Sequence, residues 1–371
     1  MNTEIMETAY LSWLARSMLP SEQLRNLMQY YHSGEAVYQA VARSDSAVLD
    51  ILSSTMRQKL FRTNNAEQIK NLVGLIQKHG IKGITITDIS FPSVLEDIRD
   101  PVSILFYQGH PECLKGRKLA VVGSRSASYN GLKATEKIAR DLSLRGIKIV
   151  SGFAYGIDTA SHHGCLQGGS PTIAVMGCGL DQNYPAENYS LRSRIVDSGG
   201  ILISEFAPGE KPLAAHFPYR NRIISALGDA LILMEAKIRS GSMTSVSHAL
   251  DQGKDVFVYP GDPSSPHYEG NHQLLREGGI YFTSALDILE DMKWLDNPVN
   301  QVQNIDCAAS AEKNSPVENT VYTALKKGPL SFDQLTAWTG ISPAELMSTL
   351  TIMQIRGDIE SLPGKIFQIR H

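Results

Sequence analysis

A turn formed by Gly123, Ser124 and Arg125 has the residue types that hold a phosphate group. It follows the apolar run LAVV and precedes a segment with helical periodicity. A glycine permits a tight turn, a hydroxyl and the amides at a helix start donate hydrogen bonds, and a guanidinium pairs with phosphate oxygens. The spacing matches neither G-x-G-x-x-G nor G-x-x-x-x-G-K-[ST], so a dinucleotide fingerprint and a P-loop are both excluded. The alternative is an ordinary strand–helix turn with a solvated arginine.

A second segment, HFPYRNRI, carries cations beside an aromatic ring. It places Arg220, Asn221 and Arg222 shortly after Phe217. Cations for phosphate and a ring for base stacking are the components of single-strand binding. In isolation, an R-x-R sequence is more typical of a solvated helix face. Here the segment lies between two predicted strands of one sheet, which favours the binding interpretation.

A third segment, EAKIRSGSMTS, follows another predicted strand and opens a helix. It contains Lys237 and the turn Ser240, Gly241 and Ser242. The N-terminus of a helix attracts anions, so the sequence predicts a second place for a phosphate on the same sheet.

Asp158 and His162 are four residues apart and could form an acid–base pair on one helix face. The favoured interpretation is a helix cap with an exposed histidine. The sequence contains no recognisable set of nucleophile, base and orienting residue, and no paired carboxylates in register. We therefore expect no catalytic residues and no enzyme.

Composition limits the remaining possibilities. The four cysteines, Cys113, Cys165, Cys178 and Cys307, form no C-x-x-C pair, and the histidines form no H-E-x-x-H, so we expect no metal site. A net charge of −3 excludes a generally basic coat, so any positive potential for nucleic acid must be local. Scattered thiols, the lack of a long apolar run and an N-terminus without a basic region predict a cytoplasmic protein with no membrane span.

The turns described above are expected to sit on a doubly wound parallel sheet. Apolar β-branched runs alternate with helical stretches from residue 118 to about 292. Strands that are buried on both faces have this composition, and in such sheets the carboxyl ends of the strands bind ligands. The predicted strands are LAVVG, IKIVSG, TIAVMG, ILISEF, ALILMEA and DVFVYPG. Upstream, ITIT and SILFYQG have strand composition, and FPSVLEDIRDP between them predicts a short helix.

The chain is predicted to have four parts. Residues 1–80 form a small helical domain, and residues 81–292 form the Rossmann-like domain. Residues 293–315 are polar and aperiodic, which predicts a linker. Residues 316–371 predict three helices followed by a hairpin, which is a winged-helix arrangement.

Several motifs, in order, resemble the DNA-processing protein A (DprA/Smf) family. They cover residues 91 to about 292, and their order makes the resemblance specific. The motifs are FPSVLEDIRDPVSILFYQG, LAVVGSR, IVSGFAYGID, PTIAVMGCGLDQNYPAEN, GGILISEF, HFPYRNRIISAL, EAKIRSGSMTS, DVFVYPG and EGNHQLLREGG. The upstream helices resemble the family's small helical (SAM-like) domain, and the tail resembles its variable C-terminal extension.

This resemblance implies an extended Rossmann-like fold that binds single-stranded DNA in a positive pocket. It also implies a homodimer, without cofactor or established turnover, that helps to load the RecA recombinase in natural transformation (competence) or acts similarly in DNA recombination. By motif position, the residues expected to bind DNA are Gly123, Ser124, Arg125, Phe217, Arg220, Asn221, Arg222, Lys237, Ser240, Gly241 and Ser242.

Two positions depart from the family pattern. Ala214 stands three residues before Phe217, where many members have a basic residue, and Tyr155 replaces the arginine of the usual S-G-L-A-R-G-I-D turn. Both changes remove positive charge near the expected pocket, which bears on DNA affinity and its dependence on salt.

The alternative function is a nucleotide or N-glycoside hydrolase on a related Rossmann-like fold. The related phosphoribohydrolases use a P-G-G-x-G-T loop with a following Glu, whereas this chain has PGDPSSPHYEG. In the tail, the predicted third helix PAELMSTLTIMQIRG has a single cation, Arg356. A protein contact or a packing role is therefore favoured over strong reading of duplex DNA.

Overall fold

The computed structural model describes residues 2–295, 316–326, 328–356, 359–362 and 366–369. The chain divides into two compact units, Met1–Asp296 and Asn297–His371. Of the predicted linker, residues 296–315 lie outside the described residues. The predicted boundary at residue 80 falls within the first unit and stays a prediction.

The first unit is built around a large mixed sheet. Within the described residues, nine strands follow the order β1-β2-β6-β5-β4-β3-β7-β8-β9. The strands are β1 (Lys82–Thr85), β2 (Ile104–Gly109), β3 (Lys118–Val122), β4 (Lys148–Ser151), β5 (Ile173–Val175), β6 (Ile201–Ser204), β7 (Leu231–Leu233), β8 (Val256–Val258) and β9 (Ile280–Tyr281). β2 runs antiparallel to both β1 and β6, and the pairs from β6 to β9 are parallel.

The sheet is doubly wound, as predicted. From β3 the chain moves outward through β4, β5 and β6, and it then returns to the other side of β3 for β7, β8 and β9. The winding therefore reverses between β3 and β7, which pair from Ala120 with Leu231 to Val122 with Leu233. A crevice forms at the carboxyl ends of the strands at such a point. β9 was not predicted, because a two-residue strand has too short a pattern to recognise.

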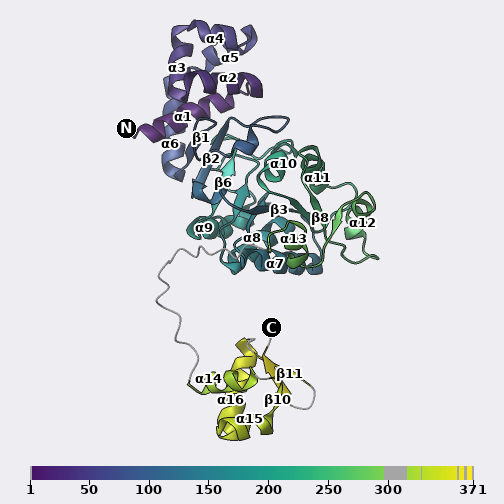
Figure 1. Cartoon of the computed structure of the whole chain (residues 1–371). Coiled ribbons are helices and arrows are strands. Elements are labelled where there is room, and N and C mark those ends of the chain that lie inside the picture. Colours follow the sequence, from purple (N-terminus) through teal and green to yellow (C-terminus); the bar gives the residue numbers. More distant parts are fainter. Residues whose placement is uncertain (1, 296–315, 327, 357–358, 363–365, 370–371) are drawn as a thin grey trace. The chain divides into compact units, whose positions relative to one another are not determined.

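Helices cover both faces of this sheet (Figure 1). On β3, Leu119 and Val121 pack toward α7, α8 and α13, whereas Ala120 and Val122 pack toward α10 and α11. This alternation follows from the two-residue period of a strand, and each buried Val or Leu contributes about 1.5–3 kcal/mol. The helices are α7 (Tyr129–Ser143), α8 (Ile157–Gly168), α9 (Tyr189–Asp197), α10 (His216–Leu227), α11 (Gly241–Asp251), α12 (Glu269–Arg276) and α13 (Ala285–Asp291).

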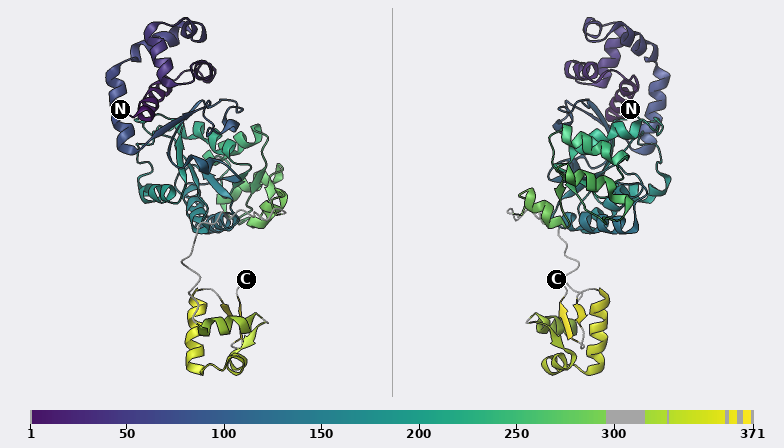
Figure 2. Two further views of the ribbon diagram at one scale, coloured as in Figure 1. Left: turned by 60° about the vertical axis from the view of Figure 1, so that its left-hand side comes forward. Right: turned by 90° about the vertical axis from the view of Figure 1, so that its right-hand side faces the viewer.

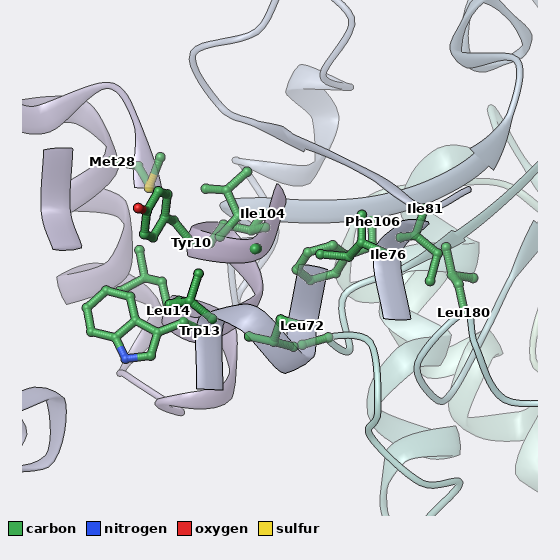
Figure 3. Close-up of a cluster of buried hydrophobic side chains, with 14 of the residues drawn as sticks. Tyr10, Trp13, Leu14, Met28, Leu72, Ile76, Ile81, Ile104, Phe106 and Leu180 are labelled. Carbon is green, nitrogen blue, oxygen red and sulfur yellow. The ribbon is translucent and has the colours of Figure 1, made fainter. Parts of the chain in front are cut away.

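The N-terminal helices share a hydrophobic core with the edge of the sheet. Trp13 of α1 and Leu72 of α6 belong to the same buried cluster as Phe106 of β2 and Leu180 (Figure 3). Two further views show these helices against the β1–β2 end of the sheet (Figure 2). They are α1 (Thr3–Arg16), α2 (Ser21–Tyr31), α3 (Gly34–Arg43), α4 (Ser46–Ile51), α5 (Ser54–Thr63) and α6 (Ala66–His79).

The short helix predicted within FPSVLEDIRDP is reduced to one 3₁₀ turn, η1 (Ser93–Leu95). Pro92 precedes it, and Pro101 disfavours helical backbone in the residue before it, so little room is left for a longer helix. The other 3₁₀ turns of the first unit are η2 (Pro111–Leu114), η3 (Ala186–Asn188) and η4 (Pro266–Tyr268).

The second unit has the predicted winged-helix arrangement. Its described elements are α14 (Pro316–Leu325), β10 (Leu330–Ser331), α15 (Phe332–Thr339), α16 (Pro343–Arg356), β11 (Ile359–Leu362) and β12 (Ile366–Ile369). β11 and β12 form the predicted hairpin, and β10 adds a short strand on the other side of β12. Val321, Leu335, Leu350 and Phe367 lie in its core. The hairpin turn, residues 363–365, lies outside the described residues.

Candidate nucleic-acid interface

A pocket of about 630 Å³ opens at the carboxyl ends of the central strands. The loops that follow β3, β4, β5, β6 and β7 all contribute to it, so the three predicted turns meet in one place. Its lining residues are Val122, Gly123, Ser124, Arg125, Ala154, Asp158, Tyr184, Pro212, Ala214, Phe217, Pro218, Arg220, Asn221, Ile224, Ser240, Gly241, Ser242 and Ser245.

A backbone hydrogen bond joins the loop after β3 to the loop after β4. Ile157 N–H donates to the carbonyl of Ser124 over 3.1 Å. Gly156 has φ +74°, and a Cβ at this position would collide with the carbonyls of Ser124 and Arg125. A glycine is required here for both reasons. The turn that carries Arg125 is therefore fixed before any ligand arrives.

Fewer amides of this turn are free than its sequence suggested. Ser124 N–H donates to the carbonyl of Glu235 over 2.7 Å, and Ser126 N–H donates to Ser124 Oγ over 3.2 Å. Ser128 N–H donates to the buried carboxylate of Glu235. What the turn presents to the pocket is mainly the Arg125 side chain and the Ser124 hydroxyl.

The pocket rim, defined here as Arg125, Phe217 and the turn from Ser240 to Ser242, carries the groups suited to phosphate and base. Arg125 is exposed, and no ion pair with it occurs among the described residues. Its guanidinium carbon lies 5.1 Å from the centre of the Phe217 ring. The rim thus combines a free positive charge with an aromatic surface.

The Ser240–Ser242 part of the rim is the N-terminus of α11. Ser240 makes no side-chain cap, and its hydroxyl lies 2.8 Å from that of Ser242. Asn221 Nδ2 donates to the Gly241 carbonyl over 3.2 Å, which ties α10 to this turn. The first N–H groups of a helix have no partner within it, so an uncapped end that lines a pocket is receptive to an anion.

The pocket floor, defined here as Asp158 and Arg220, is buried and internally compensated. Arg220 is 3% exposed and donates to the carbonyls of Gly152, over 2.7 Å, and Val175. A Cβ on Gly152 would lie 2.7 Å from Asp158 Oδ2 and 2.8 Å from Arg220 Nη2, so the two side chains are close. Burial lowers the pKa of Arg220 to about 10, which Asp158 opposes. Burial raises the pKa of Asp158, which Arg220 opposes.

Arg222 does not face this pocket, contrary to expectation. It donates to the carbonyls of Asp100 and Tyr219 and pairs with Glu205 Oε1 over 2.8 Å. It lines a separate pocket of about 390 Å³. The reason is helical geometry, because residues two apart on α10 point roughly 200° apart.

Lys237 is exposed but is not among the lining residues of the large pocket. The remaining predicted residues do line it: Gly123, Ser124, Arg125, Phe217, Arg220, Asn221, Ser240, Gly241 and Ser242.

The expectation of a helix cap with an exposed histidine is wrong for His162. This side chain is fully buried, and its Nδ1 lies 2.8 Å from the Thr172 hydroxyl. Burial lowers its pKa to about 3. The N-cap of α8 is Gly156, while the Asp158 carboxylate accepts the N–H of Ala154 over 3.2 Å. His162 thus bonds to Thr172 through Nδ1, while its buried Nε2 has no hydrogen-bond partner among the described residues. The alternative of an Asp158–His162 acid–base pair has no support in this geometry.

Tyr184 lines the pocket and was not singled out from the sequence. Its ring centre lies 5.4 Å from that of Phe217. A signal was available, since the loop containing Tyr184 follows the predicted strand TIAVMG and its carboxyl end belongs to the same edge of the sheet.

Among the residues that the structure describes, no three or more His, Cys, Asp or Glu side chains gather where they could hold a metal ion. In the same described ranges, none of the helices combines the length and the apolar character that crossing a bilayer requires.

Two family models match the chain. The model of DNA recombination-mediator protein A matches residues 82–293, and the model of the DprA winged helix domain matches residues 307–365. Among curated proteins, the DNA processing protein DprA of Streptococcus pneumoniae is 38% identical over 283 residues, covering 76% of this chain and 96% of that protein. The Smf protein of Escherichia coli is 32% identical over 332 residues, covering 88% of each chain.

Solved structures of family members resemble this one. DprA from S. pneumoniae superposes with a TM-score of 0.65 at 36% identity, covering 78% of this chain and 99% of the other. DNA processing protein A from Helicobacter pylori, in a study of its single-stranded DNA binding mode, gives a TM-score of 0.52 at 28% identity, covering 57% and 95%. Since the first family model spans more than half of the residues, the chain belongs to the DNA recombination-mediator protein A (DprA/Smf) family.

Proposed function

We propose that this protein binds single-stranded DNA at the rim of the large pocket and mediates recombination without catalysing a reaction. The DNA backbone would lie between Arg125 and the N-terminus of α11, with a base against Phe217. The single-stranded DNA binding mode described for the H. pylori relative supports this ligand.

The observation that carries the proposal is the free charge of Arg125. Arg220 and Arg222 are both 3% exposed, and each is engaged by carbonyl groups and near a carboxylate. Arg125 is exposed and unpaired within the described part of the chain, and it lies beside an aromatic ring and an uncapped helix end. In a protein with a net charge of −3, such a local cation is what a phosphate backbone needs.

The test is a salt titration of binding to a short fluorescent oligonucleotide, single-stranded and duplex. Arg125→Ala should weaken single-strand binding roughly 10- to 100-fold, because a charge-assisted hydrogen bond is lost. The slope of log K against log salt should become shallower by about 1.

Arg145→Ala is the matched control. Arg145 is an exposed arginine beyond the C-terminal end of α7, at the opposite edge of the sheet, where its guanidinium donates to the Asp141 carbonyl over 3.0 Å. This variant removes the same charge but should leave affinity and slope unchanged. Equal affinities and slopes for wild type and Arg125→Ala would show that the pocket is not the DNA site.

The non-enzymatic part of the proposal has a separate test. A nucleotide or N-glycoside hydrolase would also use the carboxyl edge of the sheet, and Asp158 is a carboxylate in the pocket. Burial raises its pKa, which Arg220 opposes, but it is the one carboxylate among the lining residues, so the pocket has no second carboxylate to share acid–base work. Incubation with nucleoside 5′-monophosphates should release no free base, and sustained release would overturn this part.

We further infer that the protein acts as a homodimer and loads RecA onto single-stranded DNA, as the family resemblance implies. Light scattering on the full chain should give twice the monomer mass. RecA should assemble faster on strands coated with single-strand binding protein when this protein is added. The Arg125→Ala variant should lose that stimulation, whereas Arg145→Ala should keep it.

A further inference from the structure

We propose that Tyr155 and Tyr184 form a second base-stacking subsite, which takes the base of the nucleotide adjacent to the one held at Arg125. The inference rests on the proposed function, because it extends the path of the same DNA strand. It assigns a ligand, a nucleobase, to two side chains that lie outside the motif residues expected to bind DNA.

The subsite adjoins the large pocket through common walls. A small second pocket, of about 20 Å³, shares Arg125, Ala154, Tyr184 and Phe217 with the first and adds Tyr155 to its lining. This volume is far too small to enclose a base. A base would instead lie on the outer faces of the rings, as in other single-strand binding surfaces.

Both rings are accessible, and one of them adjoins Phe217. Tyr155 and Tyr184 are each 39% exposed, a large fraction for rings that line a pocket. Tyr184 continues from Phe217, with ring centres 5.4 Å apart and planes tilted by 41°. An aromatic path therefore leads from the rim, past Phe217, onto the second pocket.

Hydrogen bonds join the two loops that carry these rings. Asn188 is buried, and its Nδ2 donates to the Phe153 carbonyl over 3.1 Å and to Thr159 Oγ1 over 2.9 Å. The Tyr155 hydroxyl donates to the Glu187 carboxylate, which links the loop after β4 to the loop after β5. The Tyr155 ring is thus held in place before a strand binds, and the Tyr184 ring packs against Phe217, which keeps the ordering cost of stacking low.

Charge decides which part of a nucleotide faces this surface. The exposed Glu187 carboxylate repels phosphate, and the hydrogen bond from Tyr155 lowers the pKa of Glu187, so it stays ionised at neutral pH. At the large pocket, by contrast, Arg125 and the N-terminus of α11 attract phosphate. The strand would therefore run with its phosphates toward Arg125 and its next base toward the tyrosines.

The experiment compares oligothymidylates with a matched series in which one nucleotide is abasic. Tyr184→Ala and Tyr155→Ala should each weaken binding to the intact strand about tenfold, since stacking on one ring is lost. The salt slope should stay that of wild type, because no cation is removed. For the strand whose adjacent nucleotide is abasic, the variants and wild type should bind equally.

Tyr189→Ala is the matched control, because Tyr189 is 63% exposed on the neighbouring α9 but lines neither pocket. It should bind as wild type does, and the conservative Tyr184→Phe should retain wild-type affinity. If the tyrosine-to-alanine variants bind the intact strand normally while Arg125→Ala is weakened, the subsite is refuted and the proposed function survives. Equal losses on intact and abasic strands would equally refute stacking.

Discussion

The floor and the rim of the pocket use arginine in opposite ways. On the floor, Arg220 is buried, held by two carbonyls and compensated by Asp158. At the rim, Arg125 is exposed, lies against the Phe217 ring and makes no ion pair among the described residues. The floor arginine is satisfied by the protein, and the rim arginine is left for a ligand. An arginine-rich motif therefore does not indicate how many arginines are available for binding.

This difference separates two experimental readouts. Changes in the floor should act on the free energy of unfolding, and changes at the rim should act on DNA affinity and its salt dependence. The variants below test that separation, beginning with the largest expected effect.

Arg220→Ala should lower the free energy of unfolding by about 3–5 kcal/mol, because it leaves the buried Asp158 carboxylate uncompensated. Urea denaturation followed by circular dichroism measures the effect. Arg125→Ala is the control and should unfold at the wild-type midpoint. If Arg220→Ala also unfolded at the wild-type midpoint, floor and rim would not differ in their contribution to the free energy of unfolding. Arg220→Ala combined with Asp158→Asn should recover part of the loss, since the uncompensated charge is gone.

Acid should destabilise the region behind the floor through His162. Its pKa is about 3 in the folded protein, against the ordinary histidine value of 6.5 that applies to the unfolded chain, so the unfolded chain binds the proton first. Stability is fully present above pH 6.5 and is lost as the pH falls toward 3, by roughly 3 kcal/mol at pH 4. His162→Gln should flatten this part of the pH dependence of unfolding.

The exposed His110 provides the comparison for that experiment. His110→Gln should follow the wild-type curve between pH 6.5 and pH 4. A His162→Gln curve parallel to wild type would show that another group causes the acid loss.

Arg16→Ala should weaken DNA binding about threefold to tenfold without changing the salt slope. Arg16 of α1 donates to the Pro208 carbonyl, in the loop that continues to Pro212 and Phe217 of the pocket. Without that contact the loop would have to be ordered on binding, at a cost of about 0.5–1.5 kcal/mol for each side chain fixed. Arg43→Ala, an exposed cation on α3, should have no effect. A shallower slope for Arg16→Ala would mean that Arg16 touches the strand itself.

Lys237→Ala should have the smallest effect, under about threefold in affinity at physiological salt. This side chain is exposed and lies outside the pocket lining, so its charge is largely screened. Anisotropy titrations at low and physiological salt measure it. A loss as large as that of Arg125→Ala would extend the rim to include Lys237.

Much of this architecture follows from the sequence alone. The apolar runs from LAVVG to DVFVYPG become the central strands, because only strands covered on both faces need such composition. Gly123, Phe217 and the Ser240–Ser242 turn meet because each follows a strand whose carboxyl end lies at the same edge. The topology thus accounts for most of the proposed site.

The orientation of individual side chains was less accessible. Arg220, Asn221 and Arg222 lie on a helix rather than in a turn, so they point in three directions about 100° apart. His162 has its partner, Thr172, in the connection that leads into the next strand. The sequence shows such a residue but not the tertiary contact that it makes.

The shared core between the N-terminal helices and β2 bears on how this protein could be divided or recombined. The match to the recombination-mediator family begins at residue 82, yet Ile104 and Phe106 of β2 are buried in one cluster with residues of α1 and α6. A cassette starting at residue 82 would expose both side chains, at about 1.5–3 kcal/mol each, on the face that the helices now cover. In this chain, the unit that closes a complete core is therefore larger than the segment that sequence comparison recognises as the family.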